Sequence, residues 1–311
     1  MSCFMDQISN HPLYKRHNID SAMSSLWEFY KKNFLTLFIA CLAMSLLMQY
    51  ASTMVNMKEL SSITDPMILL EKIKDLLVPI LLISVINLLF TTILQYYILF
   101  NPVSGTSFFA SIIKSLKYFI PYLIIMVLLA FAGSIAIVLG VFVLIVGAFF
   151  AMLYVVTIYL FILPVMMVEK TNIGATISRT LSLTHKHFWS NICWVAVFII
   201  LMLVISVIFS GLILLPFSGS FLKNILNPDD AGKMVDVASN PVFIILSAIV
   251  SAFTLPLMPI FACILYFNGK AGEQEVQPVI QPEPENNRVR VEDLYAKPYS
   301  EDHPDNPEKK E

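Results

Sequence analysis

Charge is what this sequence most conspicuously lacks. From Tyr118 to Val168, 51 consecutive residues include no Asp, Glu, Lys, Arg or His. Because one helical crossing of a bilayer takes about 20 apolar residues, this run is long enough to cross twice with a tight turn between the crossings. Four further stretches lack Asp, Glu, Lys and Arg: 33–57, 76–113, 187–222 and 237–269. These absences exclude a soluble domain and predict an all-α polytopic membrane bundle.

Charged residues are scarce in the whole chain, at 14%, and the formal net charge is −2. Soluble domains average about 25% charged residues. The near-neutral sum excludes the basic surface that nucleic-acid binding requires, so no nucleic-acid partner is expected. It also conceals an asymmetry, since residues 270–311 hold six basic and eleven acidic side chains and the rest of the chain is net positive.

Motifs for chemistry are also missing. The four cysteines (Cys3, Cys41, Cys193 and Cys263) are isolated, which excludes a disulfide framework and a cysteine zinc site. His185 and His187 lie 200° apart on a helix and cannot share a metal ion. The sequence has no phosphate-binding glycine loop and no nucleophile elbow. We therefore predict no catalytic residues, no metal ligands and no cofactor.

The spacing of the charge-free runs predicts about six transmembrane helices, with short interfacial amphipathic helices beside them. The helices are expected at 33–57, 76–101, 118–139, 143–168, 189–215 and 240–268. The turn inside the longest run is expected near Gly140–Gly147, where glycine makes a sharp reversal least costly. Three regions follow: a cytoplasmic N-terminal segment (1–32), a transmembrane domain (33–269) and a tail (270–311).

The short loops carry an asymmetric distribution of Lys and Arg. Nine of these residues lie on the side that holds the N-terminus, before the tail, and five lie on the opposite side. Positive residues favour the cytoplasmic side. Both termini are therefore predicted to be cytoplasmic.

Each segment on that side carries a short amphipathic pattern that leads into a crossing. In the third segment, Ile173, Ile177 and Leu181 share one helical face and Arg179 lies opposite. Such helices lie at the headgroup level, with apolar residues sunk and basic residues near phosphate. Membrane lipids are thus expected partners, through Lys32, Lys114, Lys117, Arg179 and Lys186 as candidate headgroup contacts. The alternative is that these helices only anchor and orient the crossings.

Two intramembrane features are candidates for a ligand site. Asn87, Thr91 and Gln95 recur every four residues and form one polar stripe on the second crossing. Pro256 and Pro259 fall inside the last crossing, where two prolines must free backbone carbonyls. Interhelical hydrogen bonding is the ordinary role of such a stripe. A substrate groove is the alternative, because broken helices also build transporter sites.

The tail, residues 270–311, holds six prolines and few large apolar residues, so it is predicted to be disordered. Its segment Arg288–Tyr295 is the part that could fold against another molecule. A protein partner that binds through the tail is one possibility, and a solvated tail without a partner is the other.

One passage is similar to that of a known family: Phe161-Ile-Leu-Pro-Val-Met-Met-Val-Glu169, with the amphipathic helix that follows it to Trp189. This passage resembles the membrane domain of the glycerophosphoryl diester phosphodiesterases and related uncharacterised six-helix bacterial inner-membrane proteins. The resemblance implies a multi-pass protein of a bacterial plasma (inner) membrane. Leu265-Tyr-Phe-Asn268 is similar to the close of that domain, with Asn268 in place of an acidic residue. In fused members of that family, catalysis belongs to a separate barrel of about 250 residues. The 42 residues after Gly269 cannot supply one.

These observations favour a non-enzymatic membrane protein that acts as a scaffold, a lipid-interacting module or a partner subunit. The alternative is a transporter or lipid-translocating protein that uses Asn87, Thr91 and Gln95 with the break at Pro256. A cavity that reaches Gln95 or Pro256 would favour the alternative, whereas a closed bundle would favour the scaffold.

Overall fold

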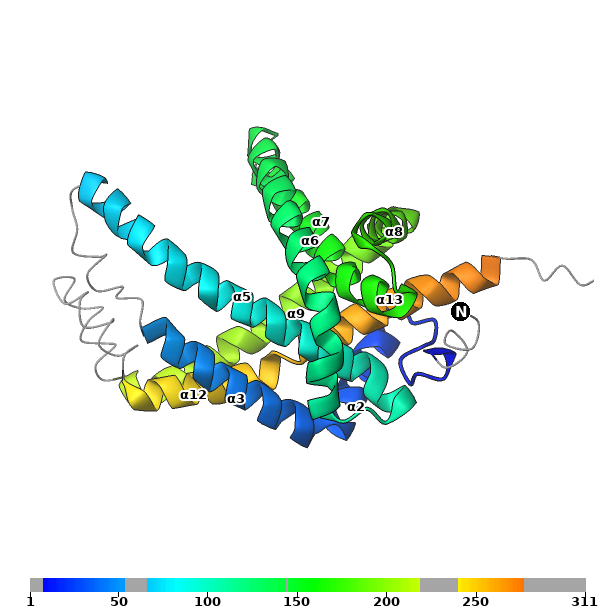
Figure 1. The fold of residues 1–311 in the computed structure, drawn as a ribbon, viewed down its shortest axis with the longest axis horizontal. Helices are drawn as coiled ribbons and strands as arrows, with labels where there is room; N and C mark the ends of the chain where they lie inside the picture. The colour runs from blue at the N-terminus through cyan, green and yellow to red at the C-terminus, as the bar shows by residue number, and fades with distance from the viewer. Residues whose placement is uncertain (1–7, 54–65, 144, 219–239, 277–311) are drawn as a thin grey trace, which may run out of the picture. The chain divides into compact units, whose positions relative to one another are not determined.

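The computed structural model describes residues 8–53, 66–143, 145–218 and 240–276, and these residues form helices and no strands. The all-α prediction is therefore confirmed (Figure 1). In chain order the elements are α2 (Ile19–Lys32), α3 (Phe34–Thr53), α5 (Pro66–Ser104), α6 (Phe108–Phe142), α7 (Ile145–Glu169), α8 (Ile173–Lys186), α9 (Phe188–Leu214), the 3₁₀ turn η1 (Leu215–Phe217), α12 (Pro241–Thr254) and α13 (Leu257–Val276).

Six helical segments of this described part are long and apolar enough to cross a membrane: 34–52, 74–104, 108–142, 146–169, 188–217 and 241–273. Their outward faces carry many exposed large apolar side chains, such as Leu82, Phe131 and Ile208. In water such surfaces would be costly, but in a bilayer they meet lipid chains. The architecture is that of a multi-pass membrane protein.

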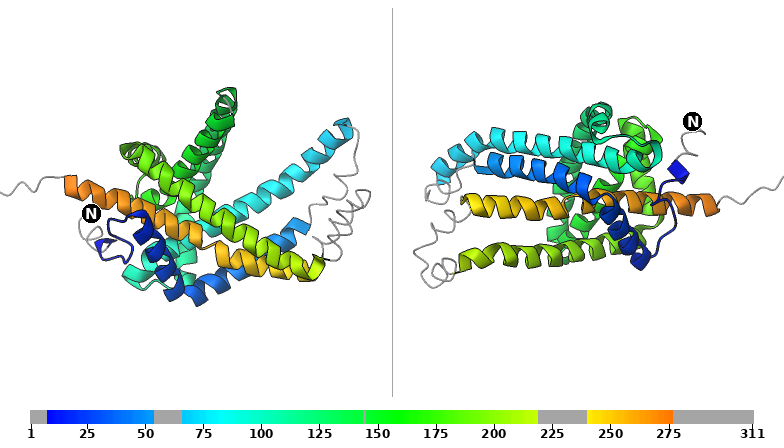
Figure 2. Two further views of the ribbon diagram at one scale, coloured as in Figure 1. Left: turned by 180° about the vertical axis from the view of Figure 1, so that it is seen from behind. Right: turned by 90° about the horizontal axis from the view of Figure 1, so that it is seen from below.

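The helices of the unit Met1–Gly272 pack in pairs. α3 lies along α12, and α6 lies along α7 in the most extensive pairing. Figures 1 and 2 show the α6–α7 hairpin diverging from the row formed by α3, α12 and α9. The largest fully buried side chains include Tyr122, Phe161 and Tyr266, so the core lies where α6, α7 and α13 come together.

The hairpin reverses between Gly140 and Gly147, as the glycine positions predict. α6 ends at Phe142 and α7 begins at Ile145. A Cβ atom on Gly147 would lie 2.6 Å from the backbone oxygen of Gly140, and one on Gly140 would lie 2.8 Å from the backbone of Ala148. Only glycine permits this close approach of the two helices.

Two of the three predicted amphipathic helices are separate elements. α2 is joined to α3 through Asn33, and α8 is joined to α9 through His187. The prediction for the middle segment was wrong. Residues 109–119 form no separate amphipathic helix, because they belong to the continuous helix α6, which starts at Phe108. Nothing between Lys117 and Tyr118 interrupts its backbone hydrogen bonds, and Lys114 and Lys117 lie on its exposed side.

The last crossing is broken where the prolines predict a break. α12 ends at Thr254 and α13 begins at Leu257. Pro256 and Pro259 have no N–H, so they cannot donate to the carbonyls of Ala252 and Leu255 four residues earlier. By contrast, Pro79, Pro102, Pro121 and Pro164 lie inside continuous helices.

The compact unit that holds the bundle includes the residues from Ile8 onward and extends to Gly272. The division into the regions 1–32, 33–269 and 270–311 stays a prediction. α13 continues through Lys270 to Val276, beyond the boundary expected at 269. Residues 277–311, with Arg288–Tyr295, lie outside the described residues, so disorder and partner binding there stay predictions.

The N-terminal segment is fastened to the bundle by His11, of which only 3% is exposed. Its Nδ1 accepts a hydrogen bond from the backbone N–H of Leu13, and its Nε2 lies 3.1 Å from the carbonyl oxygen of Ile98 at the end of α5. The ring also packs against Phe267, with 4.9 Å between centroids. Burial lowers the pKa of His11 from 6.5 to about 4, so the ring is neutral in the folded protein.

We predict that acid weakens the fold through His11. The unfolded chain takes up the proton near pH 6.5 and the folded chain only near pH 4. The contribution to stability is therefore complete above pH 6.5 and is lost as the pH falls toward 4, with a loss of about 2 kcal/mol at pH 5. Thermal unfolding in detergent at pH 7.5 and pH 5 measures this loss of stability. The loss between the two pH values should be smaller in His11→Gln, and an equal loss in the two proteins would contradict the assignment.

Candidate functional site

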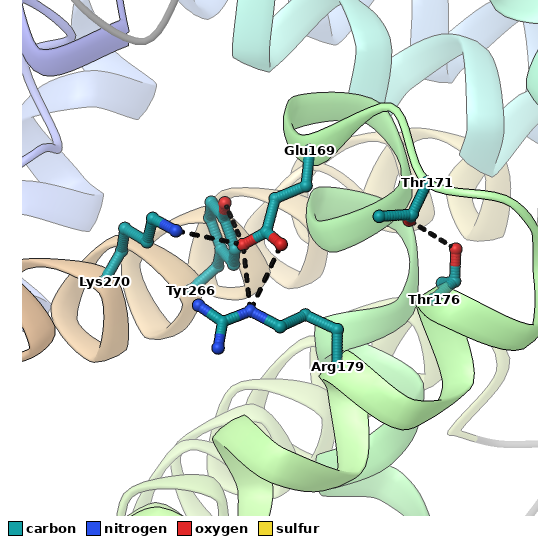
Figure 3. Close-up of polar contacts among 6 residues, drawn as sticks. All are labelled: Glu169, Thr171, Thr176, Arg179, Tyr266 and Lys270. Atoms are coloured by element: carbon teal, nitrogen blue, oxygen red, sulfur yellow. Dashed lines mark hydrogen bonds and ion pairs between the residues drawn. The ribbon is translucent and has the colours of Figure 1, made fainter. Parts of the chain in front are cut away.

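Two sites emerge from the described residues. The first is an ionic cluster, defined here as Glu169, Arg179, Tyr266 and Lys270 (Figure 3). Arg179 Nε lies 3.1 Å and 3.2 Å from the two Glu169 carboxylate oxygens. The Tyr266 hydroxyl donates to Oε1 of the same carboxylate at 3.1 Å, and Lys270 Nζ donates to it at 3.3 Å. One carboxylate at the end of α7 thus joins α7 to the middle of α8 and to α13.

The local sequence explains why Glu169 and Arg179 meet. Glu169 ends α7, and Lys170 adopts the left-handed conformation (φ 51°) that commonly terminates a helix. Asn172 then caps α8, its side chain accepting from the N–H of Ala175 at 2.8 Å. The hydroxyls of Thr171 and Thr176 pair at 2.6 Å across this turn. The chain therefore reverses directly after Glu169 and brings α8 back beside it.

The cluster is mostly shielded from solvent, with 12% of the Glu169 side chain, 18% of Lys270 and 24% of Arg179 exposed. Two cations share one carboxylate, so removing that carboxylate would leave like charges close together. An ion pair of low exposure costs much more to break on one side than a surface pair. The cluster therefore fastens α8 to the bundle.

The face by which α8 packs differs from the predicted apolar stripe. Its buried residues are Thr176, Thr180, Leu183 and Thr184. Ile177 and Leu181 are half-buried and line an apolar cavity of about 190 Å³ against α6 and α7. Part of the stripe thus packs on protein, which explains how α8 orients the α6–α7 hairpin.

The five candidate headgroup residues have different surroundings. Lys32 and Lys114 are exposed. Lys117 is exposed beside the ring of Tyr118, with its ammonium 4.8 Å from the centroid. Arg179 is engaged with Glu169. Lys186 borders a small polar cavity at the junction of α8 and α9.

The second site is the midspan cavity, a space of about 220 Å³ between α5, α6, α7, α9 and the α12–α13 break. Its wall includes Asn87, Thr91 and Gln95 together with Pro259, so the structure brings the predicted polar stripe and the predicted break to one place. Pro256 lies beside this wall, at the break itself, and is buried.

Along the stripe, burial increases toward the end of α5. Asn87 is exposed, Thr91 is half-buried, and only 2% of Gln95 is exposed. The Gln95 amide donates to Cys263 Sγ on α13 at 2.9 Å, and Thr91 donates to the Asn87 carbonyl at 2.9 Å. Gln95 thus ties α5 to α13, while Asn87 lies at the open end of the wall.

Tyr122 and Tyr159 also line the midspan cavity. The Tyr122 side chain is fully buried, and its hydroxyl lies close to that of Tyr159.

A larger cavity of about 590 Å³ adjoins this one, between α9 and α12. The two share Met202, Thr254 and Met258 as lining residues. The larger one is bordered by the hydroxyls of Ser206, Ser210, Ser247 and Ser251 as well as by apolar side chains. A mixed apolar and hydroxyl-bearing wall therefore extends from Gln95 to the far ends of α9 and α12.

Sequence reasoning missed several of these residues. Glu169 was visible only as the end of the charge-free run and as part of the family passage, although a lone carboxylate directly after 51 uncharged residues is itself a signal. Tyr266 was visible only within the family passage Leu265–Asn268, and Lys270 gave no local signal. Their shared partner, Glu169, is about a hundred residues away. Among the described residues, no group of three or more His, Cys, Asp or Glu side chains could hold a metal ion.

Comparison with known proteins gives no relative: no protein-family model matches the chain, and no curated protein or solved structure shows significant similarity to it.

We predict that Glu169→Gln lowers the free energy of unfolding by about 3 kcal/mol, since the glutamine removes the charge that pairs with Arg179 and Lys270 in a mostly shielded cluster. Unfolding of the purified protein in detergent micelles measures the loss. The exposed Glu28→Gln is the matched control and should change stability by less than about 0.5 kcal/mol. A Glu169→Gln protein as stable as the wild type would show that the cluster is not structural.

Proposed function

We propose that this chain is a non-enzymatic multi-pass membrane protein that binds a lipid between α5, α9 and the α12–α13 break. One observation carries the proposal: Asn87, Thr91 and Gln95 border the same cavity as the proline break. Closed helix packing would have buried this stripe between helices, and Asn87 is instead exposed.

The chemistry of the wall supports a lipid rather than a water-soluble ligand. The cavities lie within segments apolar enough to cross a membrane, so bilayer lipids are the molecules with direct access. Their walls are mainly apolar, with hydroxyl and amide groups but no charged side chain. The larger cavity, at about 590 Å³, falls within the range of about 300–1,000 Å³ of small-molecule sites.

The absence of a catalytic role is part of the proposal. Among the described residues, the walls of the two connected cavities include no Asp, Glu, Lys, Arg or His that could serve as an acid or base in a hydrolysis. The resemblance of Phe161–Trp189 to the phosphodiesterase membrane domain stays a prediction, and it would carry no activity, because catalysis in that family resides in the separate barrel. Purified protein in lipid should therefore not hydrolyse glycerophosphodiesters above a buffer blank, with or without Ca²⁺ or Mg²⁺. Turnover that disappears in Asn87→Leu/Gln95→Leu would overturn this proposal.

Location and orientation are proposed with the function. The resemblance of Phe161–Trp189 supports a bacterial plasma membrane. The Lys and Arg distribution supports an orientation with both termini cytoplasmic. In this orientation the ionic cluster lies at the cytoplasmic end of the bundle. The larger cavity approaches the outer leaflet, because α9 leads away from the cytoplasm.

Photocrosslinking tests lipid binding directly. A benzophenone amino acid replaces Ser210, which is exposed and lines the larger cavity, or Ile208, which is exposed two residues earlier on the same helix. We expect adducts at Ser210 to be enriched severalfold in one lipid class, whereas adducts at Ile208 follow the bulk composition. Asn87→Leu should reduce the enrichment. Identical lipid adducts at the two positions would contradict a specific site.

Lipid translocation is the second candidate, favoured by the continuity of the two cavities through Met202, Thr254 and Met258. It differs from simple binding in one measurement. Labelled lipid in vesicles containing the protein would move between leaflets faster than in protein-free vesicles, and Asn87→Leu/Gln95→Leu would slow this movement.

A further inference from the structure

The larger cavity, between α9 and α12, is bordered by two pairs of serines with i, i+4 spacing. Ser206 and Ser210 come from α9, and Ser247 and Ser251 come from α12. Because residues four apart share one face of a helix, each helix presents two hydroxyls along the side that borders the cavity. One space within the membrane span thus has four hydroxyls in its wall, supplied by two separate helices.

Two of these serines lie deep in the span. Ser206 precedes the end of α9 at Leu214 by eight residues, and Ser251 follows the start of α12 at Pro241 by ten residues. At 1.5 Å per residue, these positions are about 12 Å and about 15 Å along the helices from those ends. Half of the hydrocarbon core of a bilayer is about 15 Å thick. Both hydroxyls are therefore near the midplane of the membrane when the helix ends meet its surface.

A serine hydroxyl in a helix can bond to its own backbone or to another molecule. Ser84 and Ser134, on exposed faces of α5 and α6, donate to the carbonyls four residues earlier at 2.8 Å and 2.7 Å. By rotation about χ1, such a hydroxyl can instead donate to a bound molecule, and its oxygen can accept from one. The serines of the larger cavity can therefore bind a ligand hydroxyl or ester carbonyl without the loss of any helical hydrogen bond of the backbone.

No charged side chain accompanies these hydroxyls. Among the described residues, neither the larger cavity nor the midspan cavity has Lys, Arg or His in its wall. The N-terminus of α13 contributes only a partial positive charge, which the C-terminus of α12 directly before it offsets. A phosphate group at this depth would have no counter-charge, and burial of an ion without one is strongly unfavourable. The wall therefore selects against lipids whose charged headgroup has to enter the cavity.

We propose that the two connected cavities bind a lipid whose polar end is an uncharged alcohol, the class to which diacylglycerols belong. This inference rests on the lipid binding proposed above and names the class of lipid. The ligand hydroxyl exchanges hydrogen bonds with Ser206, Ser251 and Thr254 near midspan. The acyl chains contact the apolar part of the wall, which includes Met202 and Met258.

A competition experiment compares lipids that differ only at the polar end. Tritiated dioctanoylglycerol binds to the purified full-length protein in neutral detergent, and unlabelled lipids displace it. Dioctanoyl phosphatidate should need at least about a hundredfold higher concentration than dioctanoylglycerol, because its phosphate lacks a counter-charge. The acetate ester of dioctanoylglycerol, which has no hydroxyl, should need a concentration about two- to tenfold higher.

Two outcomes of the competition would overturn the inference. Equal displacement by phosphatidate would exclude an uncharged class and leave lipid binding itself intact. The absence of saturable dioctanoylglycerol binding would also overturn it, and the adducts at Ser210 described above then decide whether another lipid class is bound.

Removal of hydroxyls tests whether the binding belongs to the cavity. Ser206→Ala/Ser251→Ala should weaken dioctanoylglycerol binding about tenfold, because two hydrogen bonds to the ligand are lost. The matched control Ser84→Ala/Ser134→Ala removes two exposed hydroxyls outside the cavity walls and should retain wild-type affinity. Equal affinities in the two double variants would contradict the assignment of the hydroxyls.

Addition of a charge tests the basis of the selectivity. Ser210→Lys places an ammonium group in the wall, so the preference for dioctanoylglycerol over phosphatidate should fall at least about tenfold. Ile208→Lys adds the same charge at an exposed position of α9 outside the wall and should leave the preference unchanged. The same preference in both lysine variants would show that the missing counter-charge does not determine which lipid binds.

Discussion

In hydrocarbon, every backbone N–H and C=O group has to find its hydrogen-bond partner within the protein. Most of this chain satisfies that constraint with long unbroken helices, even where Pro79, Pro121 or Pro164 removes one donor. The break between α12 and α13 is the exception. Two prolines there leave carbonyls without their helical donors, and the space beside them is bordered by Thr91, Gln95 and Thr254. The break in the backbone thus lies beside polar side chains of α5.

A second constraint excludes charge from the spans, and it concentrates the ionic contacts at the ends of helices. Glu169 gathers Arg179 and Lys270 at the end where α7, α8 and α13 meet. The N-terminal segment is fastened to α5 by His11 and to α13 by His17. Polar contacts at this end therefore stabilise the association of the helices. Apolar packing cannot do this in a membrane, because lipid chains compete equally well for apolar surfaces.

The sequence was sufficient for features that depend on local composition. Charge-free runs locate the six crossings, and the glycines place the α6–α7 turn, because both features depend only on the residue types at those positions. It failed where an outcome depends on distant partners. The periodicity of α8 assigned Arg179 to the exposed face, but its carboxylate partner comes from the end of α7 and its neighbour Lys270 from α13.

The candidate site shows the same division. The stripe through Asn87 and Gln95 and the break at Pro256 were each visible in the sequence, as i, i+4 spacing and as proline chemistry. That they border one cavity depends on how α5 packs against α13, which no local pattern encodes. Tyr122 and Tyr159 complete the wall from two other helices. The choice between helix packing and a ligand groove therefore depends on a long-range arrangement and not on the local pattern.

One face of α13 connects the two regions. At 100° per residue, Pro259, Cys263, Tyr266 and Lys270 fall within about 60° of one another. Pro259 borders the midspan cavity, Cys263 accepts from Gln95, and Tyr266 and Lys270 donate to Glu169. These four residues lie in one continuous helix, Leu257–Val276, which begins directly after the break. Because no flexible segment separates them, any displacement of α13 about Pro256 must move the cavity wall and the ionic cluster together.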